Sequence, residues 1–144
     1  MPPAHRAPRG AHRFDIRTRI YWEDTDAGGV VYYANYLKFM ERCRSDWLRA
    51  LHVDQSLLRA ERQLQFAVVS VTVDFMRPAV LNDEVIVTAE LERLSGATIL
   101  FKQTIMRGDA QLVDARVRVA CLDSGTLKPR PIPKDLFVEW RNGQ

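Results

Sequence analysis

Two very short connections between strand-like segments constrain the fold of this chain most. Ser95-Gly96 and Arg107-Gly108-Asp109 separate three runs in which apolar residues recur at every second position. Such alternation is typical of half-buried strands, and a glycine-containing connection of two or three residues is typical of a hairpin turn. Parallel pairing would need a longer crossover connection. These strands are therefore predicted to pair antiparallel.

The second half of the chain holds four alternating runs, and an earlier run precedes them. In the four runs the shared apolar faces are Val69, Val71, Val73 and Phe75; Val85, Val87, Ala89 and Leu91; Ile99, Phe101 and Ile105; and Val113, Ala115, Val117, Val119 and Cys121. The earlier run, FDIRTRIYWED over 14–24, places Phe14, Ile16, Ile20 and Trp22 on one face. It is predicted to be the first strand.

A long amphipathic segment lies between the first predicted strand and the other four. From Tyr36 to Leu51 apolar residues recur every three or four positions, and polar residues fill the opposite side, which predicts a helix with Asn35 as its N-cap. A shorter helix is predicted over 54–63. The order of strand, long helix and antiparallel strands indicates an α+β domain in which a curled sheet wraps one long central helix.

Length and composition limit the chain to one globular domain. It has 144 residues, of which 47% are apolar and 27% charged, too hydrophobic for disorder and too polar for an integral membrane protein. No run reaches the ~20 apolar residues that span a bilayer, and the start has no apolar secretory segment, so a cytoplasmic location is expected. We interpret residues 1–13 as a flexible basic tail and 14–144 as the single domain.

The charged residues and cysteines argue against two other functions. Arg6, Arg9 and Arg13 account for the whole net charge of +3, so the domain itself is neutral and nucleic-acid binding is not favoured. Cys43 and Cys121 do not have the spacing of a metal site, and we interpret both as reduced, buried thiols. No metal is predicted.

The segment EDTDAGGVVYYANY, residues 23–36, combines carboxylates, two glycines and a helix start. Glycines let a ligand approach the backbone, and the first N–H groups of a helix carry partial positive charge. A carboxylate beside such donors can activate an attack on a carbonyl and stabilise the resulting oxyanion, which suggests acyl transfer to water. The same residue types also form ordinary turns, so the segment alone leaves both interpretations open.

A longer motif favours the catalytic interpretation. The run YWEDTDAGGVVYYANYLKFMERCRSDWL resembles the signature of the 4-hydroxybenzoyl-CoA thioesterase family of hotdog-fold proteins, most closely its YbgC-type (Tol-Pal-associated) acyl-CoA thioesterases. VDFMRPAVLNDEV over 73–85 and the later KPRPIP extend the resemblance to about residues 14–138. It implies a hotdog fold and hydrolysis of an acyl-CoA or acyl-carrier-protein thioester without a cofactor. The uncovered edges of such a sheet favour a homodimer, and whether dimers pair further into a homotetramer stays open.

The resemblance also implies roles for individual residues. Asp26 would be the catalytic carboxylate, as general base or nucleophile, and the backbone N–H of Tyr33 would polarise the thioester carbonyl. YbgC-type members usually carry histidine where this chain has Tyr33, so the implied contribution of this residue is its amide, ring or phenol. Lower activity or a changed substrate choice stays open. The implied substrate-binding residues are Gly28, Gly29, Val30, Tyr32, Asn35 and Tyr36.

Other residues and functions receive weaker support. Asp24 is interpreted as an orienting or turn residue, and Glu41 with Arg42 or Arg44 as a solvated or interface pair on the helix. Cations that could meet coenzyme A phosphates are Arg93, Lys102, Arg107, Lys128, Arg130 and Lys134, none singled out by spacing. The alternatives are a non-catalytic hotdog module that binds acyl groups or acyl-carrier protein, a nucleic-acid binder that uses the tail, and a hotdog dehydratase, which would need a histidine near the loop.

Overall fold

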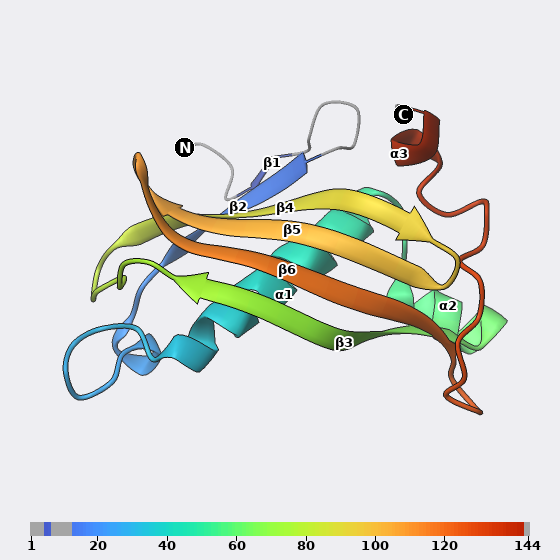
Figure 1. Cartoon of the computed structure of the whole chain (residues 1–144), viewed down its shortest axis with the longest axis horizontal. Coiled ribbons are helices and arrows are strands. Elements are labelled where there is room, and N and C mark those ends of the chain that lie inside the picture. Colours follow the sequence, from blue (N-terminus) through green and yellow to red (C-terminus); the bar gives the residue numbers. More distant parts are fainter. Residues whose placement is uncertain (1–4, 7–12, 143–144) are drawn as a thin grey trace.

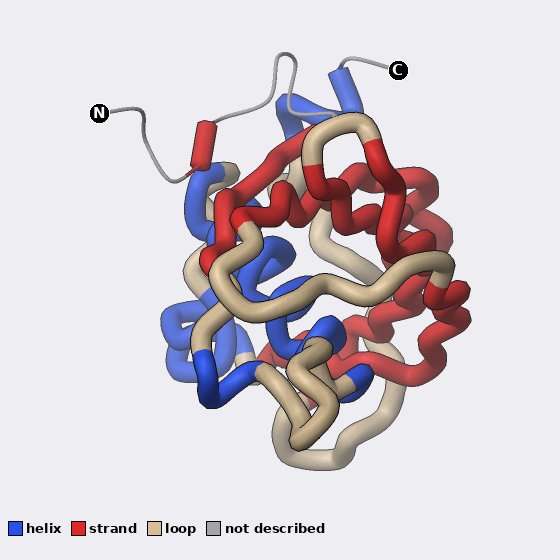
Figure 2. Tube along the Cα trace, turned by 90° about the vertical axis from the view of Figure 1, so that its left-hand side faces the viewer, coloured by secondary structure: helices blue, strands red, loops and turns tan. Residues whose placement is uncertain are grey.

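The computed structural model describes residues 5–6 and 13–142, and in it a long helix lies against one face of an antiparallel sheet. Figure 1 shows the helix crossing behind the strands, and Figure 2 shows helices and strands as two layers. The strands are β1 (His5–Arg6), β2 (Arg13–Arg19), β3 (Leu64–Phe75), β4 (Glu84–Ser95), β5 (Thr98–Arg107) and β6 (Ala110–Asp123). The helices are η2 (Trp22–Asp24), α1 (Tyr33–Ala50), α2 (Gln55–Arg62) and α3 (Val138–Asn142). The predicted α+β architecture is confirmed.

The sheet has the order β1-β2-β4-β5-β6-β3, and every pairing in it is antiparallel. Both predicted hairpins are present. The β4–β5 hairpin closes with Ser95 opposite Thr98, and the β5–β6 hairpin closes with Arg107 opposite Ala110. Their turns contain Gly96 and Gly108, whose φ angles of 60° and 58° lie in the left-handed region that glycine adopts without strain.

The core forms where the apolar stripe of α1 meets the inner face of the sheet. Each large side chain buried there contributes about 1.5–3 kcal/mol through removal of its apolar surface from water. Trp47 lies between Phe14 of β2 and Phe101 of β5, with ring centroids 6.5 Å and 6.2 Å apart. The buried residues of α1 are Tyr36, Phe39, Met40, Cys43, Trp47 and Leu48.

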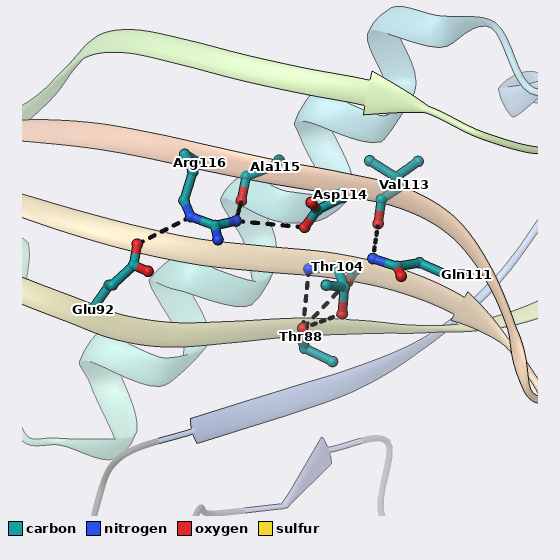
Figure 3. Close-up of polar contacts among 8 residues, drawn as sticks. All are labelled: Thr88, Glu92, Thr104, Gln111, Val113, Asp114, Ala115 and Arg116. Atoms are coloured by element: carbon teal, nitrogen blue, oxygen red, sulfur yellow. Dashed lines mark hydrogen bonds and ion pairs between the residues drawn. The ribbon is translucent and has the colours of Figure 1, made fainter.

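The opposite face of the sheet carries a polar network (Figure 3). Arg116 of β6 spans β5, placing its Nε 3.0 Å from Glu92 Oε2 of β4, and its Nη1 lies 3.5 Å from Asp114 Oδ1. The hydroxyls of Thr88 and Thr104 lie 2.7 Å apart. An antiparallel sheet with one apolar and one polar face needs a helix on the apolar face only.

Strand β3 forms one edge of the sheet and is poorly covered. Val68, Val69, Val71 and Phe75 are 49%, 54%, 40% and 49% exposed. A long apolar edge strand offers unpaired backbone groups to another chain.

No helix in the described residues is both long and apolar enough to cross a membrane.

Two predicted boundaries differ from the structure. The first strand ends at Arg19 rather than continuing to residue 24, because the Asp24 carboxylate accepts the Tyr21 N–H at 2.9 Å and the chain turns into η2. Trp22 is therefore 76% exposed instead of half-buried. Helix α1 begins at Tyr33, so Asn35 lies within the first turn and is not its N-cap.

Strand β3 and part of the predicted tail also differ from the prediction. A β-bulge between Val68 and Ser70 interrupts the alternation of β3 before Val71. At the other end of the sheet, His5 and Arg6 pair with β2, and Arg13 already belongs to β2. The remainder of the predicted tail lies outside the described residues, so its flexibility stays a prediction.

Candidate active site

A tight hairpin connects η2 to α1 and holds the Asp26 backbone. Asp26 N–H donates to the Val30 carbonyl at 2.8 Å, Gly29 N–H donates to the Asp26 carbonyl at 3.0 Å, and Thr25 pairs with Val31. Gly29 has a φ of 81°, so this turn requires a residue that tolerates the left-handed region. The glycine at position 29 is thus explained by the backbone conformation of this turn.

The Asp26 side chain is exposed and has a defined orientation. Its Oδ1 accepts the Gly28 N–H at 2.8 Å, and its Oδ2 has no partner among the described residues. A Cβ at position 28 would lie 3.3 Å from Asp26 Oδ1, a tight contact that favours glycine there. One carboxylate oxygen is therefore held while the other is open to solvent.

The N-terminus of α1 presents unpaired backbone donors. Tyr32 precedes the helix with φ −63° and ψ 127°, and its side chain makes no capping hydrogen bond. The Asn35 N–H bonds the Tyr32 carbonyl at 2.8 Å, whereas the amides of Tyr33 and Ala34 find no acceptor within the residues described. Such first-turn amides carry the positive end of the helix dipole.

Asp24 joins the loop to the helix. Its carbonyl accepts both the Tyr32 N–H at 3.0 Å and the Asn35 side-chain amide at 2.9 Å. Its carboxylate is occupied by the Tyr21 amide. These contacts agree with the prediction that Asp24 orients the loop, and they explain the position of Asn35.

A cavity of about 220 Å³ lies beside the first turn of α1. The Tyr36 hydroxyl at its inner wall accepts the Ala79 N–H at 2.9 Å, and burial raises the pKa of Tyr36, which keeps this phenol neutral. The Tyr33 ring is 60% exposed and lies 6.1 Å from the Phe75 ring of β3. The cavity is lined by Val31, Tyr33, Tyr36, Phe75, Met76, Arg77 and Pro78.

Tyr32 and Tyr33 form an aromatic pair at the entrance to α1. Their ring centroids are 4.9 Å apart, and the Tyr33 phenol raises the pKa of Tyr32. Both phenols are exposed to solvent. Position 33 thus presents a phenol beside the first turn of α1.

The structure brings together only part of the predicted site. Tyr33 and Tyr36 line the cavity, whereas Asp26 belongs to the adjacent loop and does not contribute to the lining. Gly28, Gly29, Val30, Tyr32 and Asn35 build the turn and the helix entrance instead. These residue roles stay predictions.

Arg77 is a residue that the sequence analysis missed. It lines the cavity, unlike the six cations proposed from the sequence, and it is exposed. Its only sequence signal is its place in the VDFMRPAV motif. Among the residues described, no group of three His, Cys, Asp or Glu side chains could hold a metal ion.

A curled antiparallel sheet around one long helix defines the hotdog class of proteins, and in this chain a loop with an exposed carboxylate precedes that helix. The chain belongs to the thioesterase-like superfamily, whose sequence profile matches residues 20–139. The hotdog fold and the family resemblance are confirmed.

Similar proteins agree with this assignment. The acyl-CoA thioesterase YbgC of Haemophilus influenzae is 46% identical over 129 residues, which are 90% of this chain and 95% of that protein. The acyl-CoA thioester hydrolase YbgC of Escherichia coli O6:H1 is 41% identical over 85% of this chain and 92% of its own length. The crystal structure of a probable thioesterase from Bartonella henselae has a TM-score of 0.78 and 37% identity, covering 83% of this chain and 98% of that one.

Proposed function

We propose that this chain is an acyl-CoA thioesterase that hydrolyses an acyl thioester to a free acid and a thiol. The unpartnered Tyr33 amide at the edge of an apolar cavity is the observation that carries this proposal. Family membership and the names of the relatives that are 46% and 41% identical support the same chemistry. A cavity with apolar walls and few polar groups suits an acyl group.

The helix N-terminus supplies the electrophilic half of the reaction. A thioester carbonyl oxygen near Tyr33 would accept the free N–H, which becomes a stronger interaction as negative charge develops on that oxygen. Collapse of the tetrahedral intermediate breaks the C–S bond, and the thiolate leaves and then takes up a proton. Because a thiolate leaves readily, the site needs no strong general acid.

Asp26 supplies the other half in one of two ways. As general base, its free Oδ2 accepts a proton from the water that attacks the carbonyl carbon. As nucleophile, it attacks that carbon itself, and water then hydrolyses the mixed anhydride. After a single turnover in H₂¹⁸O, ¹⁸O in the Asp26 carboxylate identifies the second route, because only water attack on the aspartyl carbon of the anhydride places it there.

The exposure of Asp26 implies that one chain does not complete the site. The Phe75 end of β3 lies beside Tyr33, and β3 is an uncovered edge strand. We therefore propose a homodimer formed through β3, in which a second copy closes the space between Asp26 and the cavity, and further pairing of dimers into a homotetramer.

Two features concern the substrate and its compartment. Coenzyme A and acyl-carrier protein both present a phosphopantetheine thioester, and Arg77 is the cation that lines the cavity. It would meet the phosphate of either donor.

The two free cysteines agree with a reducing compartment, so we place the reaction in the cytoplasm.

The first test replaces the proposed catalytic carboxylate. Asp26→Asn should lower kcat by roughly 10² to 10⁴ because the amide can neither accept the proton nor attack. Thiol release from acyl-CoA substrates of graded chain length measures the rate, and circular dichroism checks the fold. Glu23→Gln is the matched control, since it removes an exposed carboxylate from the same segment, and it should keep the wild-type rate.

Two results would contradict the proposal. An unchanged rate in Asp26→Asn would remove Asp26 from the chemistry. Acyl-CoA binding by the wild-type chain without any thiol release would favour the non-catalytic module.

A further inference from the structure

A second, smaller cavity lies at the other end of β3, between α1, α2 and the sheet. Its volume is about 110 Å³. Its lining comes from the second half of α1, from α2 and from strands β3, β5 and β6. Figure 1 shows α2 next to the start of β3. Its apolar walls are Leu48, Phe66, Val68, Ile99, Phe101 and Val119.

Arg44 of α1 brings a positive charge into these apolar surroundings. Its Nη1 donates to Gln103 Oε1 at 2.8 Å. Gln103 is fully buried, and its Nε2 donates to the carbonyls of Met40 at 3.1 Å and Thr88 at 3.2 Å. Both N–H donors and the oxygen of the Gln103 amide are therefore hydrogen-bonded. This fixes the orientation of the amide, which in turn orients the Arg44 guanidinium.

No carboxylate in the described part of the chain forms an ion pair with Arg44. Glu41 lies one helical turn away, but its Oε1 accepts the Ser45 hydroxyl at 3.1 Å. Burial lowers the pKa of Arg44, although the nearby charge of Glu41 opposes this effect. Arg44 and Glu41 therefore make no direct ion pair here, and the prediction of a solvated or interface pair of Glu41 with Arg42 or Arg44 stays a prediction. The remaining guanidinium N–H groups have no acceptor among the described residues.

A half-buried guanidinium without a direct ion pair is unfavourable, and an anion with two oxygens that accept its N–H groups would relieve this cost. The available space equals roughly four water volumes, taking about 30 Å³ for each. A carboxylate with a short hydrocarbon tail matches both the charge and the apolar walls. We propose that the Arg44 pocket, which is lined by Arg44, Glu41, Ser45, Gln55 and the six apolar residues, binds a short-chain carboxylate through the guanidinium that Gln103 orients.

This pocket is separate from the thioester cavity of the same chain. Arg44 follows Tyr33 by eleven residues along α1, a distance of about 16 Å at the helical rise. Thioester hydrolysis releases a carboxylate, so the ligand class is that of the acid product. This link to the product rests on the proposed function, whereas the binding site does not.

The test compares butanoate with butanamide by NMR titration of methyl groups in the full chain. Butanoate should give saturable shifts at the methyls of Leu48, Ile99 and Val119, and the neutral butanamide should bind at least about tenfold more weakly. Arg44→Met keeps the aliphatic stem and should weaken butanoate binding by a similar factor. Arg42→Met, on the exposed side of α1, is the matched control and should leave the affinity unchanged.

Several outcomes would overturn the proposal. Equal affinity for butanoate and butanamide would show that charge is not recognised, even if Arg44→Met does not fold. Unchanged butanoate affinity in Arg44→Met would exclude the guanidinium, and a loss of oligomeric mass in that variant with no change in affinity would assign the pocket to a second copy. Asp26→Asn should bind butanoate like the wild type, which separates this proposal from the catalytic one.

Discussion

At position 33 the backbone and the side chain can be tested separately. Tyr33 is the first helical residue, where proline is tolerated because no intrahelical bond uses its N–H. Tyr32 already has the extended conformation that a following proline requires. Tyr33→Pro therefore removes the proposed oxyanion donor without a predicted loss of the helix.

Tyr33→Ala is the matched control, because it loses the same ring and phenol but keeps the amide. We expect kcat for Tyr33→Pro to fall roughly 10² to 10³ below that of Tyr33→Ala, the range for loss of one oxyanion donor. Thiol-release kinetics give the two rates, with circular dichroism as the check on helix content. Equal rates in the two variants would assign the role of residue 33 to its side chain or to none.

The residue roles that the sequence does not reveal are those defined by distant contacts. Tyr33 could be singled out because it lies in the same short segment as Asp26. Arg44 could not, because its partner Gln103 is 59 positions away and becomes a neighbour only when β5 packs on α1. Arg77 was missed for a similar reason, since the cavity joins the end of β3 to the start of α1.

Among the elements, β3 provides the sharpest test of assembly. A lysine on an exposed edge strand disfavours pairing because its charge would have to lose water at the new interface. Val71→Lys should therefore convert the proposed dimer to a monomer and lower thioesterase activity. Sedimentation velocity measures the mass, and thiol release measures the activity.

Val138→Lys places the same charge on an exposed position of α3, whose Trp140 bonds the Leu91 carbonyl of β4. This control should keep both the mass and the activity of the wild type. A wild-type chain that sediments as a monomer and is fully active would exclude the dimer model.

Sequence periodicity predicts the elements better than their ends. The hairpins at Gly96 and Gly108 were predictable because a tight turn leaves few alternatives. The start of α1 was not predictable. Asn35 is a residue type that often caps helices, but here its side-chain amide donates to the Asp24 carbonyl. The β-bulge near Val68 is equally invisible, since alternation continues on both sides of it.

For the molecule as a whole, the two cysteines report on the integrity of the core. Cys43 and Cys121 are fully buried, and burial raises the pKa of each thiol. A raised pKa keeps the thiol protonated at pH values above the usual cysteine pKa of about 8.5. Little reactive thiolate therefore forms at pH 8. Their interpretation as reduced, buried thiols is confirmed.

We expect iodoacetamide to leave both cysteines unmodified in the native chain at pH 8 and to label both in urea. Mass spectrometry of the labelled chain checks this, and a reducing agent should not change the melting temperature. Rapid labelling of Cys43 without denaturant would mean that α1 separates from the sheet well before global unfolding.

The placement of a cavity at each end of β3 has a consequence for two chains. When two identical edge strands align in opposite directions about a twofold axis, the beginning of one lies next to the end of the other. The entrance to the acyl cavity of each subunit would then face the guanidinium of its neighbour. In the proposed dimer, an acid released by one protomer would therefore leave beside the Arg44 pocket of the other.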